Sequence, residues 1–196
     1  MHNDTVNEII LTGRLVAEKN RSDGSCVITM FSKCSKDVFL RFYCAPGVMP
    51  EHKKHAMLKI KGHLRIRKIV SEEEERANYT QGFVADEITP MTTLVEDRYG
   101  VKGKFFAEPE CYIYIKGVVH KVTPVNNYYR IHVRTNEGPG SKRDINVMLN
   151  MKKLDRQPAI HPGDTIYTVC SASTPIEEKG EDKIYWEDII ISDLAI

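Results

Sequence analysis

The stretch KIKGHLRIRK, residues 59 to 68, alternates two kinds of residue almost to its end. An apolar residue or glycine stands at every second position, and the positions between them are positively charged except for one histidine. Successive side chains of a β-strand point to opposite faces of a sheet, so this alternation predicts a strand with one buried and one solvated face. The expected buried set is Ile60, Gly62, Leu64 and Ile66, and the expected solvated set is Lys59, Lys61, His63, Arg65 and Arg67.

The single sign of charge on the solvated face has two explanations. Like charges in a row repel one another, which favours an anionic partner lying across them. The alternative is a wet, lysine-rich surface that discourages aggregation. The net charge of the chain is only +1, so any anion-binding character is local. Residues 52–68 contain seven Lys and Arg and no acid, whereas SEEEE follows at residues 71–75.

The rest of the chain contains mostly strand-like runs, in two sets that share one order. Each set has five runs, and its only insertion of helical size, a possible single turn, lies between the third and fourth runs. The first run of each set carries an internal glycine, Gly13 or Gly117, typical of a sharp bend or a close backbone approach. The runs are 8–16, 25–32, 37–44, 56–70 and 82–90, then 111–122, 127–134, 143–150, 162–173 and 183–194.

Five strands with a helix-sized insertion between the third and fourth describe the OB-fold, a small Greek-key barrel. We therefore predict an all-β protein with two tandem OB-fold five-stranded Greek-key barrels. The expected domains are residues 1–90, which form the main binding barrel, and residues 111–196. Residues 91–110 would link them, packed against a barrel through Phe105 and Phe106 because adjacent phenylalanines have no use in a loose linker.

The third run, DVFLRFYC, extends the functional argument. If Val38, Leu40 and Phe42 face the core, Phe39, Arg41 and Tyr43 lie outside. OB-folds bind oligonucleotides by stacking bases on aromatic rings and holding phosphates with cationic side chains. The opposite facing would place the aromatics in the core, but it would also bury Arg41, which is costly.

The second set shows the same pattern. With Tyr129, Ile131 and Val133 inside, the outward residues of 127–134 are aromatic or cationic. The fourth run of this set is nearly uncharged, so we expect the second barrel to be a weaker extension of the binding surface or a contact surface for another subunit. The candidate binding residues of this half are Tyr112, Tyr114, Tyr128, Arg130, His132 and Arg134.

Two motifs in the first half resemble the bacterial-type single-stranded DNA-binding protein family. ILTGRL, which contains Arg14, is similar to the first strand of that family, and KIKGHLRIRK to its fourth. The resemblance covers about residues 6–90, and the second half is similar to a diverged copy, as in family members with two barrels. It implies that Phe39 and Tyr43 are stacking aromatics and that Arg14 joins the contacts. A stacking tryptophan of the family has no counterpart, since Asp37 stands near its place.

The end of the chain departs from the family. Members usually carry a flexible, glycine-rich tail with an acidic tip that recruits partner proteins. This chain ends IYWEDIIISDLAI, which has the pattern of a strand. We therefore expect it not to recruit partners in the usual way, and a plasmid, phage or mobile-element version stays open.

No N-terminal apolar run resembles a signal peptide and no apolar segment is long enough for a membrane helix, so we expect a soluble, cytoplasmic protein. The resemblance implies that it coats and protects single-stranded DNA in replication, recombination or transfer, and that it forms a homodimer with four barrels. RNA stays open as a partner, because stacking and phosphate contacts do not read the sugar. The alternative is an OB-fold adaptor whose positively charged surface binds an acidic protein. We expect neither catalysis nor a cofactor, metal, small-molecule substrate or membrane span. The sequence shows no phosphate-binding loop or nucleophile motif.

Cysteine and histidine spacing supports the absence of a metal. The five cysteines have no C-x-x-C spacing and are expected to be buried and reduced. His52 and His55 have the spacing of metal ligands on a helical turn but lack a third ligand.

Overall fold

The computed structural model describes residues 5–33, 37–69, 78–91, 95–96, 104–105, 109–153, 159–174, 176–179, 182–185 and 187–196. None of these residues is helical, and most of them lie in β-strands, which confirms the all-β prediction. Residues 45–55, where a helical turn was expected, form turns instead. The acidic run at 71–75 and part of the second expected insertion lie outside the described residues.

The first barrel consists of β1 to β5. Antiparallel pairs join β1 to β2, β2 to β3 and β4 to β5, while an antiparallel β1–β4 pair and a short parallel β3–β5 pair close the barrel. This is the predicted five-stranded OB-fold. The strands are β1 (Val6–Asn20), β2 (Cys26–Lys33), β3 (Asp37–Cys44), β4 (Met57–Ile69) and β5 (Asn78–Pro90).

The second barrel repeats the plan with β8 to β11 and β14. Its first strand again pairs with the second and the fourth, and a parallel bridge between β10 and β14 closes it. The strands are β8 (Cys111–Val125), β9 (Tyr128–Asn136), β10 (Asp144–Lys152), β11 (Thr165–Ser173) and β14 (Asp188–Ala195). Two tandem OB-fold barrels are thus present, as the sequence predicts.

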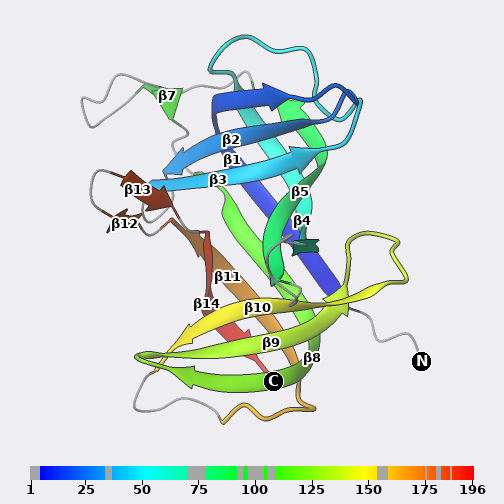
Figure 1. Ribbon diagram of the computed structural model, residues 1–196, viewed down its shortest axis with the longest axis vertical. Coiled ribbons are helices and arrows are strands. Elements are labelled where there is room, and N and C mark those ends of the chain that lie inside the picture. The colour runs from blue at the N-terminus through cyan, green and yellow to red at the C-terminus, as the bar shows by residue number, and fades with distance from the viewer. Residues whose placement is uncertain are drawn as a thin grey trace.

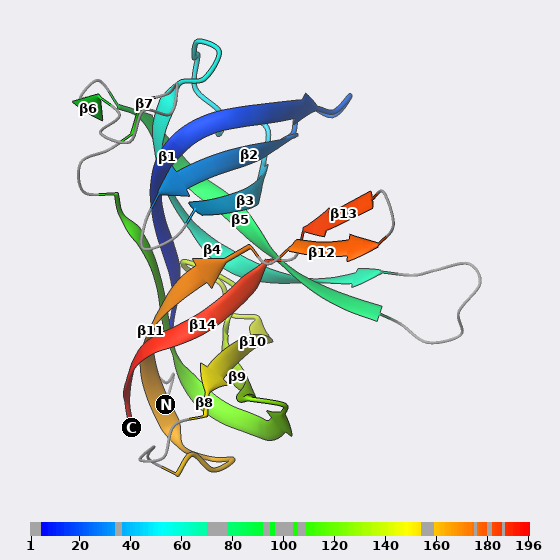
Figure 2. The ribbon, with the colours of Figure 1, turned by 90° about the vertical axis from the view of Figure 1, so that its left-hand side faces the viewer.

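The second barrel differs from the prediction at its last run. Residues 183–194 were expected to form one strand, but they divide between two. A hairpin of β12 (Ile176–Lys179) and β13 (Asp182–Tyr185) is inserted between β11 and β14. Figure 2 shows this hairpin and the long β4–β5 hairpin projecting from the same side of the molecule.

The two barrels are joined through their first strands. β1 and β8 pair antiparallel from Val6 opposite Lys116 to Leu11 opposite Cys111, so all ten barrel strands belong to one sheet. In Figure 1 the barrels lie one above the other, with β1 in the upper barrel and β8 in the lower one. The buried Asn7 strengthens this junction, since its amide group donates to the carbonyls of Leu64 and Asn136, each at 2.9 Å.

In the described part of the segment between the barrels, β6 (Val95–Glu96) and β7 (Lys104–Phe105) form a small hairpin. The last residue of the segment, Glu110, is held on β1, because the Thr12 N–H donates to the Glu110 carbonyl at 2.9 Å. The Glu110 N–H donates in turn to the Thr12 hydroxyl at 2.8 Å. The expected packing of Phe105 and Phe106 involves side chains outside those that the structure describes.

The strand glycines occupy positions where the backbone of a neighbouring strand comes very close. A Cβ atom at Gly13 would lie 2.4 Å from the Phe31 carbonyl oxygen, and one at Gly117 would lie 2.2 Å from that of Arg134. Gly62, beside a register shift in the β4–β5 pair, is equally crowded. The close backbone approach predicted for Gly13 and Gly117 is therefore confirmed.

We predict that Gly117→Ala destabilises the protein by about 1–3 kcal/mol, because the added methyl group must push one strand off another. Urea unfolding followed by circular dichroism measures the change. Gly82→Ala is the matched control, since a Cβ atom at this strand position meets nothing within 4 Å. Equal unfolding midpoints for the two variants would contradict the close approach at Gly117.

Candidate nucleic-acid interface

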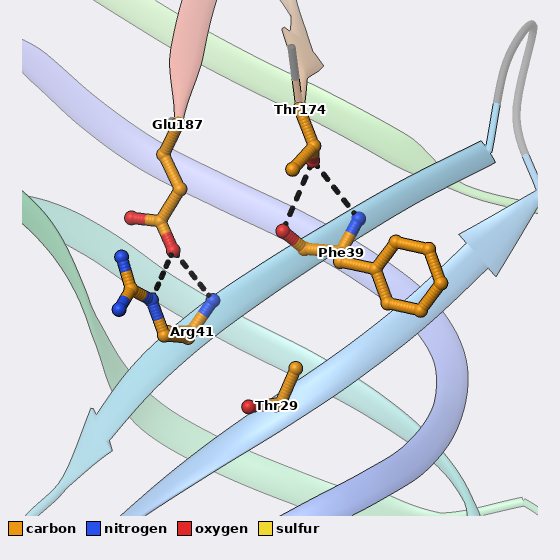
Figure 3. Close-up of a pocket in the computed structure, with 5 residues that line it drawn as sticks. All are labelled: Thr29, Phe39, Arg41, Thr174 and Glu187. Carbon is orange, nitrogen blue, oxygen red and sulfur yellow. Dashed lines mark hydrogen bonds and ion pairs between the residues drawn. The ribbon is translucent and has the colours of Figure 1, made fainter. Parts of the chain in front are cut away.

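A groove crosses the outer side of β3, made of two adjoining cavities that share Arg41 and Glu187. The first has a volume of about 310 Å³ and is lined by residues of both barrels. The second, of about 270 Å³, is bounded by β3, β5 and the far half of β4. Figure 3 shows the first cavity, with Thr29, Phe39 and Arg41 on one side and Thr174 and Glu187 on the other.

The facing predicted for β3 is confirmed. Val38, Leu40 and Phe42 are at most 2% exposed, whereas Phe39 is 39% exposed. The Phe39 ring rests on the ring of Phe31, with the centroids 4.9 Å apart, and the Arg14 guanidinium lies 5.7 Å from the Phe31 centroid. Because Phe39 has support on one side and solvent on the other, it can accept a further flat ring.

Tyr43 lies at the second cavity in contact with two guanidinium groups. Arg67 lies 4.7 Å and Arg21 5.7 Å from the centroid of its ring. These distances are typical of cation–π contacts, which fix the ring while the guanidinium edges stay available to an anion. Arg67 was expected at this surface, whereas Arg21, in the turn after β1, was not.

Arg41 is held by a residue of the second barrel. Oε1 of Glu187 accepts from the Arg41 backbone N–H at 2.9 Å and from its Nε at 3.1 Å. The Arg41 side chain is still 62% exposed, so its terminal nitrogens face solvent. Glu187 therefore orients the guanidinium and offsets part of its charge.

Thr174 makes the neighbouring contact with β3. Its hydroxyl accepts from the Phe39 N–H and donates to the Phe39 carbonyl, both at 3.0 Å. Thr174 and Glu187 stand just before and just after the β12–β13 hairpin, so both ends of the hairpin are fixed to one strand edge. Sequence analysis missed both residues, because no local pattern signals a partner more than 130 residues away.

The basic row on β4 divides in the structure. Arg65 and Arg67 line the second cavity, whereas Lys59, Lys61 and His63 line neither cavity. Carboxylates balance most of the row. The pairs are Lys59–Glu110 at 2.7 Å, Lys61–Glu87 at 3.8 Å, His63–Asp86 at 2.8 Å and Arg65–Glu137 at 3.6 Å.

Tyr112 and Tyr114 lie on β8 beside its junction with β1 and line neither cavity. Their rings stack on one another with the centroids 6.1 Å apart. Partial burial raises the pKa of Tyr114, and Tyr167, Tyr112, Glu8 and Glu110 add to the shift. The two nearby carboxylates make these surroundings unfavourable for phosphate. A role of Tyr112 and Tyr114 in binding or in contact with a second subunit stays a prediction.

The outward residues expected on β9 do face outward. Ile131 and Val133 are fully buried, while Tyr128 is 37% exposed and Arg134 is exposed. Arg130 and His132 are half-buried between them. Burial lowers the pKa of His132, and the nearby Lys121, Arg130 and His120 lower it further.

The remaining candidate groups have structural partners. His52 contacts Glu18 at 2.9 Å, and His55 lies 3.3 Å from the Leu15 carbonyl. No cluster of metal-ligating side chains occurs in the described part of the chain, which also has no helix long and apolar enough to cross a membrane. Cys26, Cys44, Cys111 and Cys170 are buried and free, as predicted, and Cys34 lies outside the described residues.

The fold defines a tandem OB-fold protein with a groove across β3. Two solved structures share this fold, a deletion variant and the wild type of the single-stranded DNA binding protein from Thermus aquaticus. The variant matches with a TM-score of 0.62 and 13% identity over 97% of this chain and 94% of its own. The wild type matches with a TM-score of 0.59 and 12% identity over 97% and 92%. No protein-family model and no curated protein matches the sequence.

We predict that Thr174→Val speeds hydrogen exchange at the Phe39 amide by about fivefold, because one hydrogen bond is worth about 1 kcal/mol. Exchange followed by NMR measures this effect. Thr174→Ser keeps the hydroxyl and should keep the protection, and the Arg41 amide, which donates to Glu187, serves as the internal reference. Unchanged protection of Phe39 in the valine variant would mean that the hairpin is not fixed to β3 in solution.

Proposed function

We propose that this protein binds single-stranded nucleic acid in the groove across β3 without catalysing a reaction. Phe39 and Tyr43 would stack with bases, while Arg41, Arg65 and Arg67 would contact phosphates. The observation that carries the proposal is the row of one exposed phenyl ring, one guanidinium and one arginine-flanked phenol on the same face of β3. Stacking of this kind tolerates any base, because every base has a π-face.

The comparisons support the same function at the level of the fold. The two solved structures bear the name of single-stranded DNA binding protein, and the match extends over both barrels. OB-folds in general bind oligonucleotides on the face where this groove lies. We propose DNA as the ligand because the two solved structures are named for it. Among the described residues, no contact in the groove distinguishes the sugar of DNA from that of RNA.

The groove is built for unpaired bases. Its rings lie in the walls of cavities of about 310 and 270 Å³, where a splayed single strand can place its bases. The bases of a duplex are already stacked on one another and cannot reach the rings. The function therefore requires a clear preference for single strands.

We predict that the protein binds oligothymidylate much more tightly than a duplex of equal length, and that affinity falls with rising salt. Each phosphate neutralised on a single strand contributes about 0.7 to the slope of log affinity against log salt. Fluorescence anisotropy of labelled oligonucleotides at several salt concentrations measures both. Equal affinity for the two ligands would contradict the stacking groove, and a flat salt response would favour the protein adaptor.

Stacking and charge can be separated within the groove. We predict that Phe39→Ala weakens binding by about 1–3 kcal/mol and leaves the salt slope unchanged, because it removes a stacking ring and no charge. Arg41→Gln should instead lower the slope by about 0.7, the share of one phosphate.

Lys61→Gln is the matched control for the charge. It removes the same charge from the same barrel, but Lys61 lines neither cavity and is paired with Glu87. Each variant must first show an unchanged melting temperature. If Lys61→Gln lowers the slope as much as Arg41→Gln, phosphate follows the β4 row rather than the groove.

A further inference from the structure

The second barrel carries a cluster of positive side chains outside the groove. They lie on the outer face of β8 and β9, where Lys121 stands directly opposite His132 in the antiparallel pair. Side chains in opposite positions have Cβ atoms about 4.5–5.5 Å apart, and like charges placed there destabilise the sheet. We name this cluster the basic face, formed by His120, Lys121, Arg130, His132 and Arg134.

The basic face lacks the carboxylates that balance β4. Within the described residues, no acid forms an ion pair with Lys121, Arg130 or Arg134, whereas Lys59, Lys61 and Arg65 each have one. In addition, the Nε atom of Arg130 is buried and has no hydrogen-bond partner in that part of the chain. A half-buried guanidinium with an unsatisfied donor is costly unless an anion completes its contacts.

The groups around His132 are cationic or neutral on every side. β8 supplies Lys121 and His120, and β9 itself supplies Arg130 and Arg134. On β10, Met148 stands directly opposite, and its backbone bonds to the Gln81 side chain of the first barrel. The carboxylate of Asp188 accepts from the amide of Asn150 at 2.9 Å, and Asn150 stands opposite Arg130 rather than opposite His132.

We propose that the basic face binds a nucleic-acid backbone and that His132 takes up a proton as the strand binds. This inference rests on the proposed function and goes beyond it, because it makes binding sensitive to pH and adds phosphate contacts on the second barrel to those of the groove. A phosphate placed between Lys121 and Arg130 cancels the repulsion that keeps the imidazole neutral.

The direction of the pH effect follows from linkage. In the free protein, burial and the surrounding cations hold the pKa of His132 below its ordinary value. An adjacent phosphate favours the charged imidazole and raises that pKa. A group whose pKa rises on binding takes up a proton, so affinity must increase as the pH falls through the range between the two pKa values.

The experiment follows the His132 ring by NMR over a pH titration, with and without oligothymidylate. Thymine and the phosphodiester do not change charge in the range where histidine titrates, so protons taken up belong to the protein. We expect the pKa of His132 to be higher in the complex. Calorimetric affinity should rise about three- to tenfold between about pH 7.5 and about pH 5.5, the range that one histidine can supply.

Two variants make the result specific. His132→Gln should remove most of this pH dependence, while His161→Gln, a change of an exposed histidine paired with Asp164 in its own turn, should keep it. Lys121→Gln changes an exposed residue, so it tests the face even if the His132 variant folds poorly. It should lower the salt slope by about 0.7.

The outcomes separate the two proposals. Binding of oligothymidylate with an unchanged pKa of His132 would overturn the proton-linked basic face and leave the groove of the first barrel intact. Absence of binding at every pH would overturn the proposed function and this inference together.

Discussion

The pairing of β1 with β8 is the constraint on which the rest of the structure depends. Six residues of each strand are in register, and they turn two small barrels into one sheet of ten strands. Separate barrels on a linker would move independently, because interfaces between domains of one chain are usually small and polar. Here hydrogen bonds of the sheet fix the second barrel against the first, and Asn7 ties β1 to both β4 and β9.

The groove across β3 is a consequence of that fixed arrangement. Among the described residues, β5 pairs with Phe42, Tyr43 and Cys44 of β3, which leaves the first half of that strand edge without a neighbouring strand. A free strand edge exposes unpaired backbone groups, which proteins usually cover. Thr174 and Glu187 cover it from the second barrel, and the same two residues form the far wall of the first cavity. The same two contacts therefore cover the strand edge and form part of the candidate site.

The sequence predicted what depends on local periodicity. The facing of Val38, Leu40 and Phe42 and the buried side of β4 follow from a two-residue repeat within single strands. The crowding at Gly13 and Gly117 follows from a glycine inside a strand. It did not predict the β12–β13 hairpin, because KIYWEDIIISDL is strand-like on both sides of the break and has no glycine or proline between them. Nor could it predict Glu187 beside Arg41, a contact between residues 146 apart that only the β1–β8 junction brings together.

The ion pairs show most clearly why the order of charges in the sequence does not predict the charge of a surface. The densest basic run in the sequence lies on β4, yet Glu110, Glu87, Asp86 and Glu137 come from other segments to balance it. The less conspicuous cations of β8 and β9 keep their repulsion, because β10 offers them Met148 and Asn150 rather than acids. The free energy of a charged side chain depends on the charges near it in space and not on the charges next to it in the sequence. In the two proposals together, the first barrel supplies rings and oriented guanidiniums, while the second supplies uncompensated charge. A chain of net charge +1 would then still hold a polyanion.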